Sequence, residues 1–346
     1  MTTRRKFLTG AGAGAGVLAA GLPTAAFAQP QITWRMQTYA GSALAEHVVK
    51  PAIDTFNSIA GDRMQIELFY ADQLVPTSEL FQAMQRGTVD AVQSDDDSMA
   101  SPTDVASFGG YFPFGSRYSL DVPVLFNKYG LKEIWEEDYA RAGVKHISAG
   151  SWDPAHFATK EPIRSLSDLE GKRIFTFPTA GRFMSQFGVV PVTIPFEDVE
   201  VALQTGEIDG IAWCGITELH TVGWADVTNY FLTNNISGAW IGHFFANMER
   251  WNEVPEDLQL LLTTCLEQSH YYRQWWYWGG EAELRVNTDK LELTSIPDDE
   301  WAVVEEAARD FWDEIAVESE TKARVVEIFK RYNEDMQSAG RPYRYG

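Results

Sequence analysis

The middle of the chain repeats a local pattern that few folds can accommodate. An apolar run at 172–177 leads through a Pro-Thr-Ala-Gly turn into a helix-like segment, and a second apolar run follows at 189–194. Pro195 then opens another helix, which ends at Gly206, and a third apolar run occupies 208–213. Strands joined by single helices pair in parallel through right-handed crossovers. This stretch therefore predicts an α/β unit built on a parallel sheet.

Ligands of such sheets bind beyond the carboxyl ends of the strands. Two segments of the pattern follow strands in this way, one from Thr179 to Arg182 and one from Trp213 to Glu218. We therefore expect both segments, with Cys214 in the second, to face a ligand.

The first half of the chain carries a second copy of the same pattern. Strand-like runs at 32–36, 64–70 and 89–92 alternate with helix-like runs at 43–59 and 77–86. Each copy contains a helix, a glycine, an acidic residue and then a strand, as in ELFQAMQRGTVDAVQ and EVALQTGEIDGIAW. Two similar lobes enclose a cleft, and clefts are where small ligands usually bind.

Later segments predict how the two lobes are joined. Strands at 141–151 and 237–247 should cross between the lobes as a two-strand hinge. A helix at 255–278, dense in aromatic residues, should pack across the back of both lobes. We assign residues 31–151 and 242–275 to the first lobe, and residues 152–241 and 276–346, with C-terminal helices at 298–312 and 322–336, to the second.

Residues 1–28 have the features of an export signal. The adjacent Arg4 and Arg5 precede a weakly apolar run at 10–22, and the triplet AFA that ends at Ala28 fits a cleavage site. The paired arginines favour the twin-arginine pathway, with an ordinary secretory signal as the alternative. We expect cleavage after Ala28 and a periplasmic protein.

Composition excludes several classes of partner. The chain has 28 Lys and Arg against 49 Asp and Glu, a formal charge of −21, and loss of the signal with its three basic residues would leave −24. Such a negative chain is unsuited to nucleic acid or to anionic membrane surfaces. The two cysteines, Cys214 and Cys265, are too few for a disulfide framework, and we expect free thiols.

The sequence contains none of the common catalytic motifs. Its six histidines show no metal-ligand spacing, and neither a G-x-S-x-G nor a C-x-x-C motif occurs. We therefore predict a binding protein without enzymatic activity, cofactor or metal.

Several motifs together resemble one transport family. TWRMQ follows the export signal, EGKRI precedes a glycine turn, PFEDVEVALQTGEIDG at 195–210 is the most specific segment, and GHFFANMERWNEVPEDLQ comes later. With these motifs the chain resembles the substrate-binding proteins of tripartite ATP-independent periplasmic (TRAP) transporters, and its start is most similar to the α-keto-acid-binding branch. The resemblance implies a type II two-lobe fold, a closing cleft, a long helix spanning both lobes and a membrane permease as partner.

Two positions depart from the family pattern. The resemblance implies an arginine that clamps a substrate carboxylate, but Phe175 stands at the matching position. Arg182, on the first turn of the next helix, is the candidate substitute. The glutamate with which the α-keto-acid branch holds a metal is replaced by Ala212. These departures argue against a metal-bridged keto acid.

Acidic and aromatic residues gather where the cleft is predicted. Asp95, Asp96 and Asp97 follow the strand at 89–92, at the position that Trp213 occupies in the second copy. A buried carboxylate needs a cationic partner, and aromatic faces attract ammonium groups. For single residues, a solvated loop or ordinary core packing is the alternative. The candidate binding residues are Tyr39, Asp95, Asp96, Asp97, Trp152, Phe175, Arg182, Trp213, Cys214, Glu218, Trp240 and Phe244.

These residues favour a small cationic amine or amino alcohol, similar to ethanolamine or choline, as the ligand. The alternative ligand is a small organic acid held by Arg182, and the alternative protein class is the binding component of an ATP-driven (ABC) importer. A ligand that contacts both lobes would close the cleft, because it favours the closed state. The sequence leaves open whether the protein is a monomer or a dimer.

Overall fold

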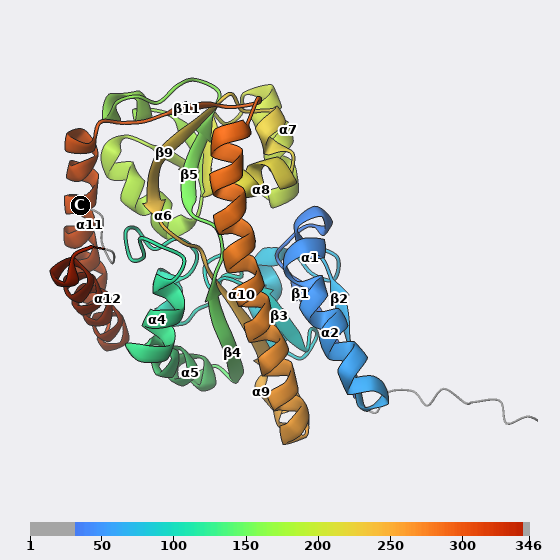
Figure 1. The fold of residues 1–346 in the computed structure, drawn as a ribbon. Coiled ribbons are helices and arrows are strands. Elements are labelled where there is room, and N and C mark those ends of the chain that lie inside the picture. The colour runs from blue at the N-terminus through green and yellow to red at the C-terminus, as the bar shows by residue number, and fades with distance from the viewer. Residues whose placement is uncertain (1–31, 342–346) are drawn as a thin grey trace, which may run out of the picture.

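The computed structural model describes residues 32–341, in which two β-sheets are flanked by helices (Figure 1). The predicted two-lobe α/β fold is confirmed. The predicted export signal and its cleavage site lie outside the described residues.

The first sheet contains five strands and is mixed. Its order is β2 (Met64–Phe69), β1 (Ile32–Thr38), β3 (Ala91–Ser94), β10 (Ile241–Asn247) and β4 (Val144–Ser151). The strands of the first half, β1, β2 and β3, pair in parallel, whereas β10 runs antiparallel to both β3 and β4. β4 leads out of this sheet toward the second lobe and β10 leads back from it, so these two neighbours run in opposite directions.

The second sheet repeats this arrangement. Its order is β11 (Glu292–Thr294), β9 (Tyr230–Ser237), β5 (Ala155–Thr159), β8 (Gly210–Cys214), β6 (Arg173–Thr176) and β7 (Val190–Val192). β6 pairs in parallel with β7 and β8, as the repeated pattern predicts, and β5 runs antiparallel to β8 and β9. The carboxyl ends of β6 and β8 therefore lie at the same edge of the sheet.

The helices follow the predicted order with some changes of extent. The α-helices are α1 (Ser42–Val48), α2 (Lys50–Ala60), α3 (Leu80–Gln85), α4 (Asp121–Lys128), α5 (Leu131–Arg141), α6 (Pro178–Met184), α7 (Val199–Thr205), α8 (Ile216–Thr221), α9 (Met248–Asn252), α10 (Glu256–Asn287), α11 (Asp298–Ala316) and α12 (Glu320–Ala339). The 3-10 turns are η1 (Gly61–Arg63), η2 (Thr77–Glu79), η3 (Asp104–Phe108), η4 (Leu166–Leu169), η5 (Ser185–Phe187), η6 (Phe196–Asp198) and η7 (Trp224–Asp226). Across residues 32–341, no helix combines the length and the apolar character that a membrane crossing requires.

The single helix predicted at 43–59 is divided into α1 and α2. Val49 separates them with φ −120° and ψ −50°, outside the helical range. Pro51 explains the break, because proline has no backbone N–H to continue the hydrogen-bonded ladder and its ring conflicts with the preceding turn. The helix therefore restarts with Pro51 in its first turn.

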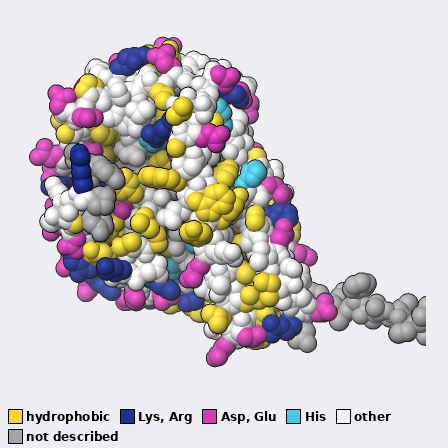
Figure 2. All heavy atoms as spheres, in the orientation of Figure 1, with side chains coloured by type: hydrophobic (Ala, Val, Ile, Leu, Met, Phe, Trp, Pro, Cys, Tyr) yellow, Lys and Arg dark blue, Asp and Glu magenta, His cyan; other side chains and the backbone are white. Residues whose placement is uncertain are grey.

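The long helix α10 joins the two lobes, as predicted (Figure 1). It packs on α2 and β4 of the first lobe and on α8 of the second. Only part of its aromatic surface is used for this packing. Tyr277 is buried, whereas Tyr271, Trp275 and Trp278 are 53–69% exposed. Figure 2 shows hydrophobic side chains exposed over the middle of this helix.

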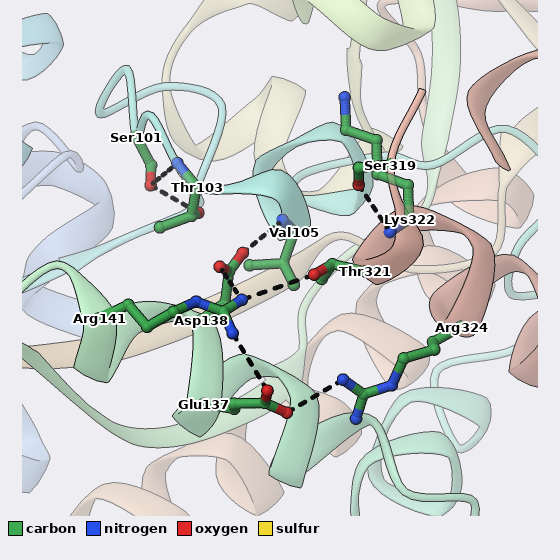
Figure 3. A network of polar contacts seen from close by, with 10 residues as sticks. All are labelled: Ser101, Thr103, Val105, Glu137, Asp138, Arg141, Ser319, Thr321, Lys322 and Arg324. Atoms are coloured by element: carbon green, nitrogen blue, oxygen red, sulfur yellow. Dashed lines mark hydrogen bonds and ion pairs between the residues drawn. The ribbon is translucent and has the colours of Figure 1, made fainter. Parts of the chain in front are cut away.

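The last helix, α12, packs on α11 and also on elements of the first lobe. It packs on η3, α4 and α5. Figure 3 shows two contacts that tie α12 to α5: the Arg324 guanidinium donates to Glu137 at 3.0 Å, and Arg141 donates to the Thr321 hydroxyl at 3.5 Å. The C-terminal helices therefore contact both lobes. The lobe boundaries stay a prediction.

Two crossing segments connect the lobes, between β4 and β5 and between β9 and β10. Their backbones are hydrogen-bonded to each other where they pass: Trp152 N donates to Trp240 O at 2.9 Å, and Trp240 N donates to Asp153 O at 2.7 Å. This pairing places the side chains of both crossings at one point between the sheets.

Candidate functional site

Two buried carboxylates meet beside the crossing segments. Asp153 accepts hydrogen bonds from the Tyr111 hydroxyl at 2.9 Å and from Gly215 N at 2.8 Å. Glu218, in the first turn of α8, accepts from the Tyr277 hydroxyl at 2.8 Å. Ligand atoms of Asp153, Cys214 and Glu218 all lie within 4.8 Å of one another. The chain thus concentrates negative charge at a point that water does not reach.

Burial makes ionisation of this pair costly. It raises the pKa of Asp153 well above the usual range, and the neighbouring Glu218 charge raises it further. Burial likewise raises the pKa of Glu218 to about 7, against the opposing effect of the Tyr277 hydrogen bond. Desolvation disfavours the charged form, so a bound cation would restore both carboxylates to their ionised state.

Asp95 brings a third buried carboxylate from the first lobe. Its Oδ1 accepts from the backbone N–H groups of Asp97 at 2.9 Å and Ser98 at 2.8 Å. Its Oδ2 is buried without a hydrogen-bond partner among residues 32–341. Burial raises the pKa of Asp95 to about 6. An unpartnered buried acceptor is costly, and a ligand that donates to it would remove that cost.

The two aspartates after Asp95 have different roles. Asp97 Oδ2 accepts from Thr179 N at 3.2 Å, so it links the first lobe to the start of α6 in the second. Burial and the nearby Asp95 charge raise the pKa of Asp97 to about 7. Asp96 does not belong to the site. It accepts hydrogen bonds from Trp135 and Tyr139 and lies 3.0 Å from His243 Nε2, inside the first lobe.

Three aromatic rings pack together next to the carboxylates. The ring centroid of Tyr39 lies 5.0 Å from that of Trp240 and 5.7 Å from that of Trp152, and the two tryptophans are 4.7 Å apart. The charges of Glu218, Asp153 and Asp95 all add to the effect of burial in raising the pKa of Tyr39. Tyr39 therefore lies close to carboxylates from both lobes.

One face of Trp152 is already covered by a cation. The Arg273 guanidinium carbon lies 4.0 Å from the centroid of the Trp152 ring, and Arg273 also donates to Val48 O at 2.7 Å. The ring centroid of Phe244, a predicted site residue, lies 5.6 Å from the same guanidinium carbon, and the ring also packs against His270. Phe244 thus supports Arg273 and does not reach the carboxylates.

Trp213 and Phe175 form a stack within the second lobe. The Trp213 ring is stacked on Phe177 at 3.8 Å and on Phe175 at 4.5 Å. Phe175 is buried and also touches Trp224. Phe175, at the arginine position of the family pattern, therefore packs against Trp213 and holds its ring in place.

Arg182 does not face the site, and this prediction is wrong. Its side chain is 52% exposed and pairs with Glu318 at 2.9 Å and Glu314 at 3.8 Å. The guanidinium also lies over Phe311. Because α6 turns this position toward α11, an organic acid held by Arg182 has no support.

Four residues of the site were missed in the sequence: Tyr111, Asp153, Arg273 and Tyr277. Asp153 directly follows Trp152, so the predicted crossing strand could have indicated it. Arg273 is the only charged residue between 268 and 280, in an aromatic stretch of α10, and a lone arginine there is a signal of burial. Nothing in the sequence distinguishes Tyr277 from its aromatic neighbours.

Asp153, Cys214 and Glu218 provide two oxygens and one sulfur that could approach a metal ion. Burial, with the charges of Glu218 and Asp153, raises the pKa of the Cys214 thiol, which keeps it protonated. Hard cations such as Ca²⁺ prefer oxygen ligands throughout. This donor set is therefore a poor fit for a hard metal ion. Cys214 and Cys265 are both free and buried, as expected.

Residues 41–319 match the family described as Bacterial extracellular solute-binding protein, family 7. The chain belongs to this family. The predicted TRAP solute-binding protein is thereby confirmed, and the ABC alternative is not supported. Proteins of this kind bind a small molecule in the periplasm and deliver it to a TRAP membrane permease.

Solved structures extend this relationship. A TRAP periplasmic solute-binding protein from Chromohalobacter salexigens, with bound (S)-(+)-2-amino-1-propanol, is 81% identical, covers 92% of this chain and 100% of its own, and has a TM-score of 0.90. A TRAP protein from Bordetella bronchiseptica, described as a dimer with calcium and picolinate in its active site, is 19% identical, covers 90% of this chain and 95% of its own, and has a TM-score of 0.81. The second comparison speaks for the fold alone.

Curated relatives are more distant. The monocarboxylate 2-oxoacid-binding periplasmic protein of a Nostoc strain is 24% identical over 89% of this chain and 85% of its own length. The ectoine-binding periplasmic protein TeaA of Halomonas elongata is 22% identical over 88% of this chain and 89% of its own. These proteins differ from one another in ligand, so the ligand here depends on the residues of the site.

Proposed function

We propose that this solute-binding protein captures a small amino alcohol such as 2-amino-1-propanol between its lobes. The observation that carries the proposal is the group of buried carboxylates Asp95, Asp153 and Glu218, which lack a compensating side-chain cation of their own. Arg273 stacks on Trp152 and donates to Val48 O, and among the described residues it forms no ion pair with these carboxylates. The 81% identical protein that holds an amino alcohol supports the same ligand class.

The proposed binding residues come from both lobes and from the crossing between them. Asp95 and Tyr39 follow strands of the first sheet, Asp153 lies in the crossing, and Glu218 starts α8. A ligand that bridges these groups would favour the closed arrangement and so present a defined surface to the permease. We propose no catalytic role, because burial and the neighbouring carboxylate charges raise the pKa of the Cys214 thiol and so keep this potential nucleophile protonated.

The proposal also covers export. Residues 1–28 would be removed by cleavage after Ala28, and the paired Arg4 and Arg5 would direct the chain to the twin-arginine pathway. Mass spectrometry of the mature protein from a periplasmic extract tests the cleavage site. Replacing both arginines with lysine should stop export by that pathway and leave the precursor in the cell.

Isothermal titration calorimetry tests the ligand class. Both enantiomers of 2-amino-1-propanol and ethanolamine should bind, whereas pyruvate and pyroglutamate should not. At about 1.5 kcal/mol per non-hydrogen atom, a five-atom ligand reaches about 7.5 kcal/mol, a Kd of a few micromolar. Binding of the acids without the amines would overturn the proposal.

A further inference from the structure

The aromatic residues of the site do not form an open cage. One face of Trp152 is covered by Arg273 at 4.0 Å, and Trp213 is stacked on Phe175 and Phe177. Trp240 packs against both Tyr39 and Trp152. A quaternary ammonium ligand is usually recognised by several free aromatic faces. Here those faces are engaged by other side chains, so cation–π contacts cannot be the main source of affinity.

Hydrogen-bond acceptors are what the site offers instead. Asp95 Oδ2 has no donor among the described residues, and it comes from the first lobe. In the described part of the chain, Asp153 and Glu218 accept hydrogen bonds from two hydroxyls and one backbone N–H, all of them neutral groups. A buried carboxylate gains most from a charged N–H donor. Within residues 32–341, no charged N–H donor is hydrogen-bonded to these carboxylates, and the buried indole N–H groups of Trp152 and Trp240 have no acceptor either.

We propose that the site is specific for a primary ammonium group, which donates hydrogen bonds to carboxylates of both lobes, and that it rejects N-methylated and quaternary amines. This inference rests on the proposed function and narrows its ligand class. A primary ammonium has three N–H donors, one for each of the carboxylates Asp95, Asp153 and Glu218, whose charges all act on Tyr39. A trimethylammonium group has none and would leave these acceptors buried and unsatisfied.

Pairs of isomers separate this effect from ligand size. 2-Amino-1-propanol and N-methylethanolamine have the same atoms, as do 2-amino-1-butanol and N,N-dimethylethanolamine, but the members of each pair differ in the number of N–H donors. In calorimetric titrations at pH 8, the primary amine of each pair should bind more tightly. Choline should bind at least about 100-fold more weakly than ethanolamine, because each buried acceptor left without its charged donor weakens binding at least about tenfold.

Asp95→Asn tests the acceptor directly. The amide oxygen can still accept from the N–H groups of Asp97 and Ser98, while the amide NH₂ replaces the free Oδ2 with a donor. Affinity for 2-amino-1-propanol should fall about 30-fold or more, with a much smaller change for N,N-dimethylethanolamine. Asp62→Asn, on the exposed surface, is the matched control and should leave both affinities unchanged.

Three results would overturn the inference. Choline binding as tightly as ethanolamine would show that the aromatic rings recognise the cation. Equal affinities within the isomer pairs would show that the site does not distinguish amines by their number of N–H donors. If no amine binds while an organic acid does, the proposed function fails and this inference fails with it.

Discussion

Glu218 is the carboxylate whose replacement separates charge from shape. It is buried, it accepts one hydrogen bond from Tyr277, and it lies beside Asp153, without an ion pair to any residue in the range 32–341. Glutamine at this position would keep the volume and the acceptor but remove the negative charge. The energetic role of the charge can therefore be measured without opening a cavity.

We expect Glu218→Gln to weaken 2-amino-1-propanol binding about 30- to 1000-fold, because losing one partner of a buried charge pair costs about 2–5 kcal/mol. The ligand-free variant should melt at a higher temperature at pH 8, since an unfavourable buried charge is gone. Calorimetry and thermal unfolding measure both effects. Glu283→Gln, exposed on α10, should change neither. An unchanged affinity in Glu218→Gln would remove this residue from the site.

Ligand binding should depend on pH in a defined direction. The pKa of Glu218 is raised to about 7 by burial and that of Asp95 to about 6. A cationic ligand needs the ionised carboxylates, so affinity should increase from pH 5 to pH 8. For each proton released on binding, Kd should change about tenfold per pH unit below the raised pKa. Titrations in buffers of different ionisation enthalpy count these protons, and an affinity independent of pH would contradict the scheme.

The raised pKa of Glu218 affects the stability of the ligand-free protein in the opposite direction: stability should fall with rising pH, whereas ligand affinity should increase. Between the unfolded pKa of about 4.5 and the folded value of about 7, the folded state holds more protons on Glu218 than the unfolded state does. The free energy of unfolding should therefore fall as the pH rises through this window. Denaturant titrations at pH 5 and pH 8 test the sign, and saturating ligand should reduce the loss.

At the scale of elements, strand β10 passes so close to the aromatic rings that it admits no side chain at one position. A Cβ atom on Gly242 would lie 2.0 Å from the Trp240 ring and 2.6 Å from Trp152 Nε1. The glycine is therefore needed for contact between the strand and the site, and not for an unusual backbone angle. Gly279 on α10 is the contrasting case, since nothing lies within 4 Å of the Cβ that it lacks.

We expect Gly242→Ala to destabilise the protein by about 1–3 kcal/mol and to weaken ligand binding, because Trp240 and Trp152 must move. Gly279→Ala should instead stabilise α10 by up to about 1 kcal/mol without affecting binding. Chemical denaturation and calorimetry on the two variants provide the comparison. If Gly242→Ala binds the ligand and unfolds like the unmodified protein, the close packing of β10 on these rings is not required for binding or stability.

At the scale of the whole molecule, the two lobes are in contact and the site between them is buried. Thr179 N of the second lobe donates a hydrogen bond to the Asp97 carboxylate of the first lobe, next to the carboxylates that would hold the ligand. In the absence of ligand, the uncompensated charges of Asp95, Asp153 and Glu218 oppose this contact. The ligand-free protein should therefore populate a more open arrangement.

Small-angle X-ray scattering should show a smaller radius of gyration with 2-amino-1-propanol than without it. Asp97→Ala should reduce this compaction and weaken binding by about three- to tenfold, because it removes one hydrogen bond to the charged group at about 1 kcal/mol or more. Asp62→Ala is a control at an exposed aspartate. Identical dimensions with and without ligand would rule out closure as the response to binding.

Local sequence patterns determined the order of strands and helices, the duplication of the lobes and the transport family, because strand–helix alternation and the segment at 195–210 depend on neighbouring residues. They also pointed to Tyr39, Asp95, Trp152, Trp213, Glu218 and Trp240. The preference for an amine over an acid came from the loss of an arginine at Phe175. All of these signals are readable without knowing which distant residues meet.

Only the tertiary structure decided which charges remain uncompensated. It moved Asp96 into the first lobe and Arg182 to the surface, and it brought Asp153, Tyr111 and Tyr277 together with Glu218. It also placed Arg273 on Trp152, so one face of a ring that was predicted to bind the ligand cation is already covered by a side chain. The physical reason is that burial and partner distance, which set the energy of a charge, depend on contacts between residues far apart in the chain.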